Sequence, residues 1–168
     1  MEIVTKRCLL RNWRAEDEPR VFDIYSRWEV ARWLGSEPRA MESADEARRL
    51  IERWGDLNDS EPLARRWAVA LPDGHLLGTL ILVPLPDGAG EVEVGWHLDP
   101  DAWGQGYASE TARAALGWGF QQGLPEIFAV VRPDNAASIA LCARLGMQAL
   151  GRTTRYYGSE LELFRATR

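Results

Sequence analysis

Two glycines separated by one residue, Gly104 and Gly106, lie in the stretch from Asp99 to Glu110, between an expected strand and an expected helix. Glycines at this spacing let the backbone turn tightly and bring successive N–H groups close to a bulky anion. The helix start that follows adds unpaired N–H donors and a partial positive charge. The stretch is therefore suited to hold a diphosphate, although a Gly-x-Gly taken alone is explained equally well by an ordinary tight turn.

The position of this stretch excludes two other phosphate-binding motifs. A dinucleotide-binding fingerprint lies in the first strand-to-helix turn and is followed by an acidic residue at the end of the next strand. Here at least four expected strands come first, and Glu126 precedes the next strand instead of ending it. A P-loop needs Gly-Lys-Ser/Thr at the helix start, and none follows these glycines. What remains is a phosphate loop placed late in the chain.

Periodicity predicts the elements that position this loop, since alternation of apolar and polar residues favours strands and a spacing of three or four favours helices. Before the loop we expect a strand, two helices and an antiparallel meander of three strands. After it we expect a helix, a buried strand, a second helix and two closing strands. The expected strands cover residues 6–13, 67–71, 76–83, 91–98, 127–131, 147–150 and 160–164, and the expected helices begin near residues 16 and 43, after the loop glycines, and at residues 134–135.

Two of these helices carry recognisable start signals. Ser43 and Glu46 form the pattern of a capping box, in which each side chain satisfies the backbone N–H of the other. Asp134 or Asn135 can cap the last helix, and Gly146 marks its end.

Composition indicates one folded domain over residues 1–168. Hydrophobic residues make up 46% of the chain, and no Pro/Gly/Ser-rich linker divides it. The formal net charge is −5 and no Lys/Arg-rich run is present, so we expect no nucleic acid among its partners. Residues 1–14 lack a long apolar core, so we expect a cytoplasmic protein without membrane contact. Cys8 and Cys142 lack the spacing of zinc ligands, so we expect buried thiols and no metal.

Three segments together resemble the GNAT superfamily, the Gcn5-related N-acetyltransferases, and within it most closely the RimJ/RimL-like branch that acetylates the N-termini of ribosomal proteins. The expected order of elements fits this superfamily over nearly the whole chain. The resemblance implies an α/β (α+β) fold, with a central mixed, mostly antiparallel twisted sheet of about six to seven strands flanked by about four helices. The segments are Glu93–Leu98, Trp103–Glu110, and Asn135–Ser138 together with Leu145–Met147.

The resemblance also implies the cosubstrate, acetyl-coenzyme A (acetyl-CoA), and the residues that hold it. In the superfamily the loop N–H groups bind the diphosphate, the strand before the loop pairs with the pantetheine arm, and the Asn that opens the next helix contacts the cofactor. Trp103 stands where Arg or Gln is common, a replacement that resembles the ribosomal-protein branch. The residues concerned here are His97, Leu98, Trp103, Gly104, Gln105, Gly106, Tyr107, Ala108, Ser109 and Asn135.

Acetyl transfer to an amine needs a proton acceptor for the amine and a proton donor for the departing thiolate. Glu93 is the candidate base, although a Glu in a strand is as often a solvated residue. Ser138 is the candidate acid, because the related branch has a Ser near this helix start, although such a Ser can simply solvate the helix end. The Tyr that serves as acid in many members is replaced by Cys142, whose helical spacing favours core packing. Glu110 is expected to point away from the diphosphate.

The function we expect is transfer of an acetyl group from acetyl-CoA to a primary amine, on a protein N-terminus or a small molecule, by direct attack in a ternary complex. Trp33 lies in the 32–41 loop, where the superfamily shapes its acceptor groove, and is the candidate substrate-binding residue. Two alternatives stay open: a module of the same fold that binds acyl-CoA without turnover, and an unrelated interaction domain. The sequence leaves the acceptor and the oligomeric state open, a homodimer included.

Overall fold

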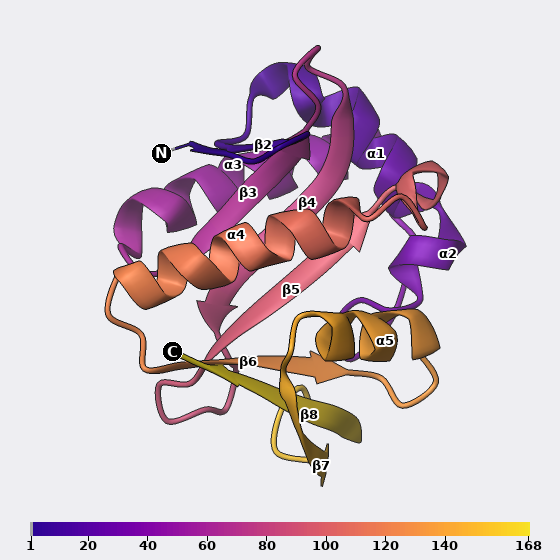
Figure 1. Ribbon diagram of the computed structural model, residues 1–168. Coiled ribbons are helices and arrows are strands. Elements are labelled where there is room, and N and C mark those ends of the chain that lie inside the picture. Colours follow the sequence, from indigo (N-terminus) through magenta and orange to yellow (C-terminus); the bar gives the residue numbers. More distant parts are fainter. Residues whose placement is uncertain (1) are drawn as a thin grey trace.

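The computed structural model describes residues 2–168, and one eight-stranded sheet forms its centre, in the order β1-β2-β3-β4-β5-β6-β8-β7 (Figure 1). Every neighbouring pair is antiparallel except β5 and β6, which run parallel. The mixed, mostly antiparallel sheet is therefore confirmed. The strands are β1 (Ile3–Val4), β2 (Leu9–Arg11), β3 (Arg65–Ala70), β4 (Leu76–Pro84), β5 (Val92–Leu98), β6 (Glu126–Val131), β7 (Gln148–Thr153) and β8 (Leu161–Thr167).

Helices cover both faces of the sheet. Figure 1 shows α4 and α5 in front of the strands, and α1 and α3 behind them. The counts of eight strands and five α-helices in this part of the chain slightly exceed the expected numbers, because the two-residue β1 and the four-residue α2 are too short for periodicity to detect. The α-helices are α1 (Glu18–Ser26), α2 (Trp28–Ala31), α3 (Ala44–Ser60), α4 (Tyr107–Gln121) and α5 (Ala136–Arg144), and single 3₁₀ turns cover Ala15–Asp17 and Pro100–Ala102.

The start of α3 realises only half of the expected capping box. The Ser43 hydroxyl accepts a hydrogen bond from the Glu46 N–H at 3.3 Å. The Glu46 carboxylate pairs instead with the Arg39 guanidinium at 2.8 Å, because that cation lies within reach in the preceding loop. The reciprocal bond that we expected from Glu46 was therefore wrong, and the helix begins where the Ser predicted it.

The core holds α4 close to the sheet. The ring of Trp67 on β3 is fully buried and meets Trp118 of α4 edge-on, with centroids 5.3 Å apart. At the next residue, a Cβ at Gly119 would lie 2.7 Å from the side chain of Ile127 on β6. The absence of a side chain at Gly119 therefore allows α4 to lie close to β6 without displacing the end of the Ile127 side chain.

The parallel pair β5 and β6 is joined only at its start. A single pairing, Glu93 with Phe128, links the two strands. Beyond it β5 stays paired with β4 as far as Leu98, while β6 stays paired with β8, and Figure 1 shows β5 and β6 spreading apart. Residues 94–98 therefore face a gap in the sheet, with backbone groups on that edge that no strand pairs.

Among residues 2–168, no helix has both the length and the apolar character needed to cross a bilayer.

Candidate functional site

Two cavities lie at the place where β5 and β6 spread apart. The loop cavity, of about 750 Å³, is lined by the 103–109 loop, the end of β5 and the start of α5. The aromatic cavity, of about 400 Å³, is lined by α1, the 33–35 segment, α3, β5, β6 and the segment between β7 and β8. The two cavities border each other, because they share the lining residues Trp33, Leu34, Trp96, His97, Asn135 and Ser138.

The glycine loop presents its backbone N–H groups without internal partners. Gly104 (φ 72°) and Gly106 (φ 83°) adopt the left-handed conformation that glycine favours, and Gly106 is the N-cap of α4 without a side-chain bond. Turn and cap hydrogen bonds are donated by the N–H of Trp103 and then by that of Glu110. Between them, in the described chain, residues 104–109 donate no such bond. A tight turn closed on itself is excluded, and the free donors match those of an anion site.

Most of the residues assigned to the cofactor meet around the loop cavity. Leu98, Trp103, Gly104, Gly106, Tyr107, Ala108 and Ser109 line it, as do His97 and Asn135. Gln105 does not: its side chain donates to the Asp101 carbonyl at 2.9 Å, and its own carbonyl accepts from Arg7 at 2.9 Å. Only its backbone N–H remains to contact an anion.

Trp103 ties the loop back to the strand before it. Its indole Nε1–H donates to the carbonyl of Leu98 at 2.8 Å, while 47% of the residue surface stays exposed. The bond fixes the path of the chain between the end of β5 and the two glycines. Trp103 therefore shapes the loop through a hydrogen bond that no sequence pattern displays.

Glu110 points away from the loop cavity, as expected. Its carboxylate accepts bonds from the Thr5 hydroxyl (2.6 Å), the Arg7 N–H (2.6 Å) and the Arg7 side chain (2.8 Å). Burial raises the pKa of Glu110, but the hydrogen bonds from Thr5 and Arg7 outweigh it and leave the pKa below its ordinary value. The negative charge is thus compensated by the N-terminal segment and not by a ligand.

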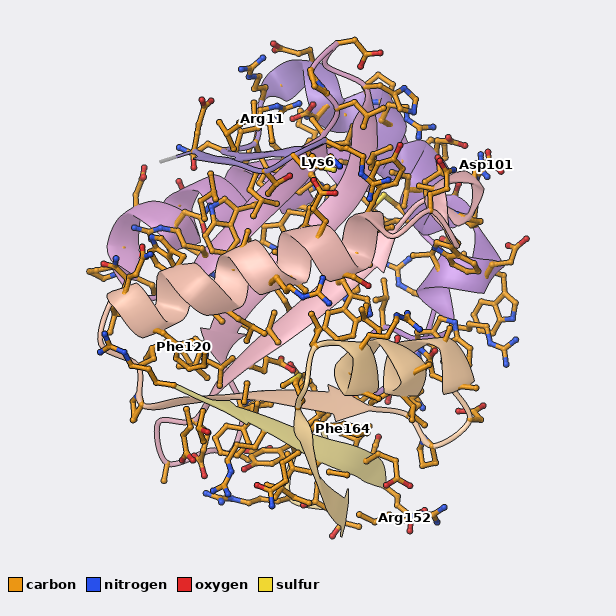
Figure 2. All side chains as sticks on the ribbon, in the orientation of Figure 1. Lys6, Arg11, Asp101, Phe120, Arg152 and Phe164 are labelled. Carbon is orange, nitrogen blue, oxygen red and sulfur yellow. The ribbon has the colours of Figure 1, made fainter. Side chains whose placement is uncertain are left out.

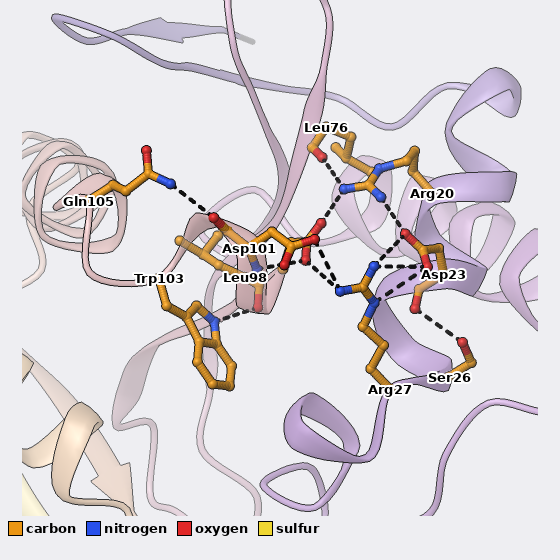
Figure 3. Close-up of polar contacts among 10 residues, drawn as sticks. Arg20, Asp23, Ser26, Arg27, Leu76, Leu98, Asp101, Trp103 and Gln105 are labelled. Atoms are coloured by element: carbon orange, nitrogen blue, oxygen red, sulfur yellow. Dashed lines mark hydrogen bonds and ion pairs between the residues drawn. The ribbon is translucent and has the colours of Figure 1, made fainter.

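A set of ion pairs anchors the loop to α1 (Figure 3). Asp99, which is 3% exposed, pairs with Arg20 and, at 3.3 Å, with Arg27. Arg27 also reaches Asp101 and Asp23, each at 3.3 Å. Burial raises the pKa of Asp99. The hydrogen bonds and charges of Arg20 and its neighbours lower this pKa by more than burial raises it, so it lies below the usual value. The segment that leads into the 103–109 loop and α1 are therefore linked through a buried carboxylate.

Glu93 faces the aromatic cavity and is buried. It is 4% exposed and accepts a hydrogen bond from the Tyr157 hydroxyl. Burial raises the pKa of Glu93 to about 7, although the bond from Tyr157 lowers it. The interpretation of Glu93 as a solvated strand residue is therefore wrong. A carboxyl group with a pKa near neutrality is suited to accept a proton under ordinary conditions.

Tyr157 is a site residue that the sequence did not reveal. The sequence indicated only a turn at residues 157–159, and the contact joins positions 64 residues apart. The signal available in the sequence was a large aromatic residue directly before Gly158. In the structure Tyr157 adopts φ 56°, which is uncommon for a residue with a side chain. A bulky residue in such a conformation is a mark of function or strain.

Ser138 and Asn135 lie on the border of the two cavities. Asn135 caps α5, since its side-chain oxygen accepts from the Ser138 N–H at 3.1 Å. The Ser138 hydroxyl accepts from the indole N–H of Trp96 at 3.2 Å. Because that bond uses a lone pair on the oxygen, the hydroxyl proton of Ser138 stays available for donation.

Cys142 is packed in the core, as its helical spacing indicated. Its side chain is fully buried and lies outside the lining of both cavities. Burial raises the pKa of the Cys142 thiol to about 12. A thiol in this position stays protonated and does not reach the reacting groups.

His97 and Trp33 complete the border between the cavities. The Nδ1 atom of His97 lies 3.2 Å from the Tyr25 hydroxyl, and burial lowers the pKa of His97 to about 4, so the ring is neutral. Trp33 lines both cavities, and the Arg32 guanidinium lies 4.5 Å over its ring. In residues 2–168, no three His, Cys, Asp or Glu side chains gather as metal ligands.

Comparison with known proteins gives concordant matches. The family model for the acetyltransferase (GNAT) domain matches residues 7–148. The Bacillus subtilis protein YoaA, whose name is that of an uncharacterized N-acetyltransferase, is 33% identical over 154 residues, covering 90% of this chain and 85% of its own. A GNAT-family acetyltransferase from Bacillus anthracis superposes with a TM-score of 0.82 at 22% identity, covering 99% of this chain and 98% of its own. Mycobacterium smegmatis RimJ in complex with CoA-disulfide gives 0.80 at 20% identity, covering 99% and 86%.

Proposed function

We propose how this chain, which belongs to the GNAT acetyltransferase family, carries out its reaction. It transfers the acetyl group of acetyl-CoA to a primary amine by direct attack. One observation carries the mechanism: the loop cavity and the aromatic cavity meet at the gap between β5 and β6, on shared residues. A thioester held from one side and an amine entering from the other would face each other there, so a ternary complex needs no covalent enzyme intermediate.

The residues around the loop cavity fit the carrier. The unpaired N–H groups of residues 104–109 and the start of α4 would hold the diphosphate. The backbone edge of residues 94–97, which precedes the Leu98 carbonyl bound by Trp103, would pair with the amides of the pantetheine arm, as an added strand does. Once bound, acetyl-CoA supplies an activated acetyl group at the border of the two cavities. N–H groups of β5 that face the gap are suited to stabilise the charge that develops on its carbonyl oxygen.

Glu93 would act as the base. An amine is a nucleophile only after losing its extra proton, and the Glu93 carboxylate faces the cavity from which the amine would enter. Its pKa of about 7 makes it ionised at slightly alkaline pH, yet basic enough to accept a proton directly or through one water. No cation pairs with Glu93 in the described residues, so an ammonium group would find an uncompensated carboxylate there.

Ser138 would supply the proton to the departing thiolate. Its hydroxyl lies on the border of the cavities and holds its orientation through the Trp96 indole. The alternative candidate, Cys142, is removed by its position in the core.

A thiol-release assay with acetyl-CoA and a panel of peptide N-termini, polyamines and aminoglycosides tests this function. Intersecting lines in double-reciprocal plots are expected for a ternary complex, and parallel lines would contradict direct attack. Calorimetry with acetyl-CoA separates the alternatives: tight binding without transfer to any amine would favour a module that holds acyl-CoA without turnover. Absence of both binding and transfer would remove the function altogether.

A further inference from the structure

The aromatic cavity carries two opposite charges at different depths. Among its lining residues, within the described part of the chain, Glu93 is the single carboxyl group and Arg132 the single guanidinium. Glu93 is buried, whereas Arg132 is partly exposed. An occupant of this cavity therefore meets an acidic group at the sheet and a cation further out.

Arg132 keeps most of its donors free. It follows directly on β6, and one Nη2–H donates to the carbonyl of Gly35 at 2.8 Å, across to the segment after α2. No carboxylate lies within ion-pairing distance of Arg132 in residues 2–168. A guanidinium has five N–H donors in a planar fork that matches a carboxylate. The contact with Gly35 therefore positions the fork at the cavity without neutralising it.

Five Trp and Tyr side chains line the same cavity. Side chains from α1, the segment after α2, α3, β5 and the segment between β7 and β8 contribute rings. Flat apolar walls favour a flat apolar occupant, which gains both buried area and ring contacts. The rings belong to Tyr25, Trp33, Trp54, Trp96 and Tyr157.

The spacing of the charges limits the length of the occupant. Phe128 on β6 is the partner of Glu93 across the two strands, and Arg132, the residue directly after β6, follows Phe128 by four positions. At about 3.3 Å per residue this separates the two backbone positions by about 13 Å along the strand. Both side chains reach into the cavity and shorten the gap, so a body of one ring with groups at opposite ends suits it.

We propose that the acceptor is a primary amine on an aromatic body whose far end bears a carboxylate, with the amine at Glu93 and the carboxylate at Arg132. The assignment rests on the proposed function, since it names the acceptor of that reaction. Polyamines are disfavoured because a second ammonium group would face the Arg132 guanidinium, and like charges at a partly desolvated site repel.

A matched series of three one-ring amines tests this acceptor class. 4-(Aminomethyl)benzoate, 4-methylbenzylamine and 4-(aminomethyl)benzylamine share one body and differ at the far end by an anion, a methyl group or a cation. For the native chain we expect kcat/KM to fall about 10-fold from the carboxylate to the methyl compound, and further for the diamine, because a charge-assisted bidentate pair is lost and then reversed. Dissociation constants measured in the presence of CoA should rise along the same series, so the carboxylate compound binds most tightly and the diamine least tightly.

Arg132→Gln should remove the preference between the carboxylate and methyl compounds, measured as the ratio of their two kcat/KM values within the same variant. The control is Arg152→Gln, because Arg152 lies on β7, well away from Asp101 and its loop (Figure 2), and pairs on the surface with Glu160 and Glu162. Equal kcat/KM for the series in the native chain, or a preference that survives Arg132→Gln, would overturn the acceptor class. So would an absence of binding by all three compounds, while thiol release with other amines would leave the acetyltransferase activity standing.

Discussion

The hydroxyl of Tyr157 donates a hydrogen bond to the carboxyl group of Glu93 across the wall of the aromatic cavity. The bond comes from the segment between β7 and β8 and reaches the one point where β5 and β6 are paired. Burial raises the pKa of Glu93, and the bond from Tyr157 partly offsets that rise in the group to which we assign the proton transfer.

Tyr157→Phe should move the acid limb of the pH profile upward. The bond from Tyr157 favours the ionised form of Glu93, so its loss raises a pKa that is already about 7. Activity requires the carboxylate, so as the pH falls the variant should lose its activity at a higher pH than the native chain does. The measurement is kcat/KM against pH, and Tyr156→Phe is the matched control because the Tyr156 hydroxyl faces Glu91. An unshifted limb in Tyr157→Phe would argue against Glu93 as the titrating group.

Glu93→Gln should stabilise the fold at alkaline pH while abolishing most of the activity. Burial raises the pKa of Glu93 from 4.5 to about 7, so the folded state holds a proton that the unfolded chain releases between these values. Below pH 4.5 the carboxyl group is protonated in both the folded and the unfolded state and does not oppose folding. As the pH rises from 4.5 to above 7, the free energy of unfolding falls by up to about 3 kcal/mol. Thermal unfolding should show a higher Tm for Glu93→Gln at pH 8 and little difference at pH 4.5. Equal differences at both values would show that Glu93 is solvated.

Gly106→Val should weaken acetyl-CoA binding by about 10-fold to 100-fold. A β-branched residue is strained at φ 83°, and its side chain would displace the backbone that faces the diphosphate. Calorimetry with acetyl-CoA gives the affinity directly. Gly74→Val is the matched control, since Gly74 has φ 91° in a turn outside both cavities and carries the same backbone strain. Equal loss of affinity in both variants would point to general destabilisation.

Asp99→Asn should destabilise the fold and raise the KM for acetyl-CoA. The change removes the carboxylate between Arg20 and Arg27, which keep Asp23 as a partner, so the loss of these charge-assisted hydrogen bonds should cost about 2 kcal/mol. The loop that follows Asp99 loses its link to α1, so cofactor affinity should fall at a temperature where the variant is folded. Asp45→Asn serves as control, because its pair with Arg48 is exposed and should contribute well under 1 kcal/mol. Denaturant unfolding and the KM for acetyl-CoA are the two measurements.

Features set by neighbours in the chain were predictable from the sequence. Gly104 and Gly106 predict a turn with free amides, and Asn135 predicts the cap of the helix that it opens. Each of these residues shapes the backbone only at its own position or a few residues away. The hydrogen bond that Glu93 accepts comes from Tyr157, 64 positions later in the chain, and no local pattern reports it. The carbonyl of Gln105 likewise accepts a hydrogen bond from Arg7, 98 positions earlier, so the orientation of Gln105 in the loop could not be predicted from its neighbours.

The ion pairs behind the loop show the same division. Asp99 and Asp101 stand on either side of Pro100, but their partners come from α1 (Arg20) and from the residue that ends it (Arg27), more than seventy positions earlier. Only folding brings these charges together.

The gap between β5 and β6 divides the sheet into leaves of five and three strands that share one rung, Glu93 with Phe128. Along this seam, the line between β5 and β6 beyond the Glu93–Phe128 rung, the two strands make no further pairing. A pantetheine arm lying there would act as a temporary strand, closing the seam on arrival and reopening it on departure. Each catalytic cycle would then complete and dismantle part of the protein's own architecture.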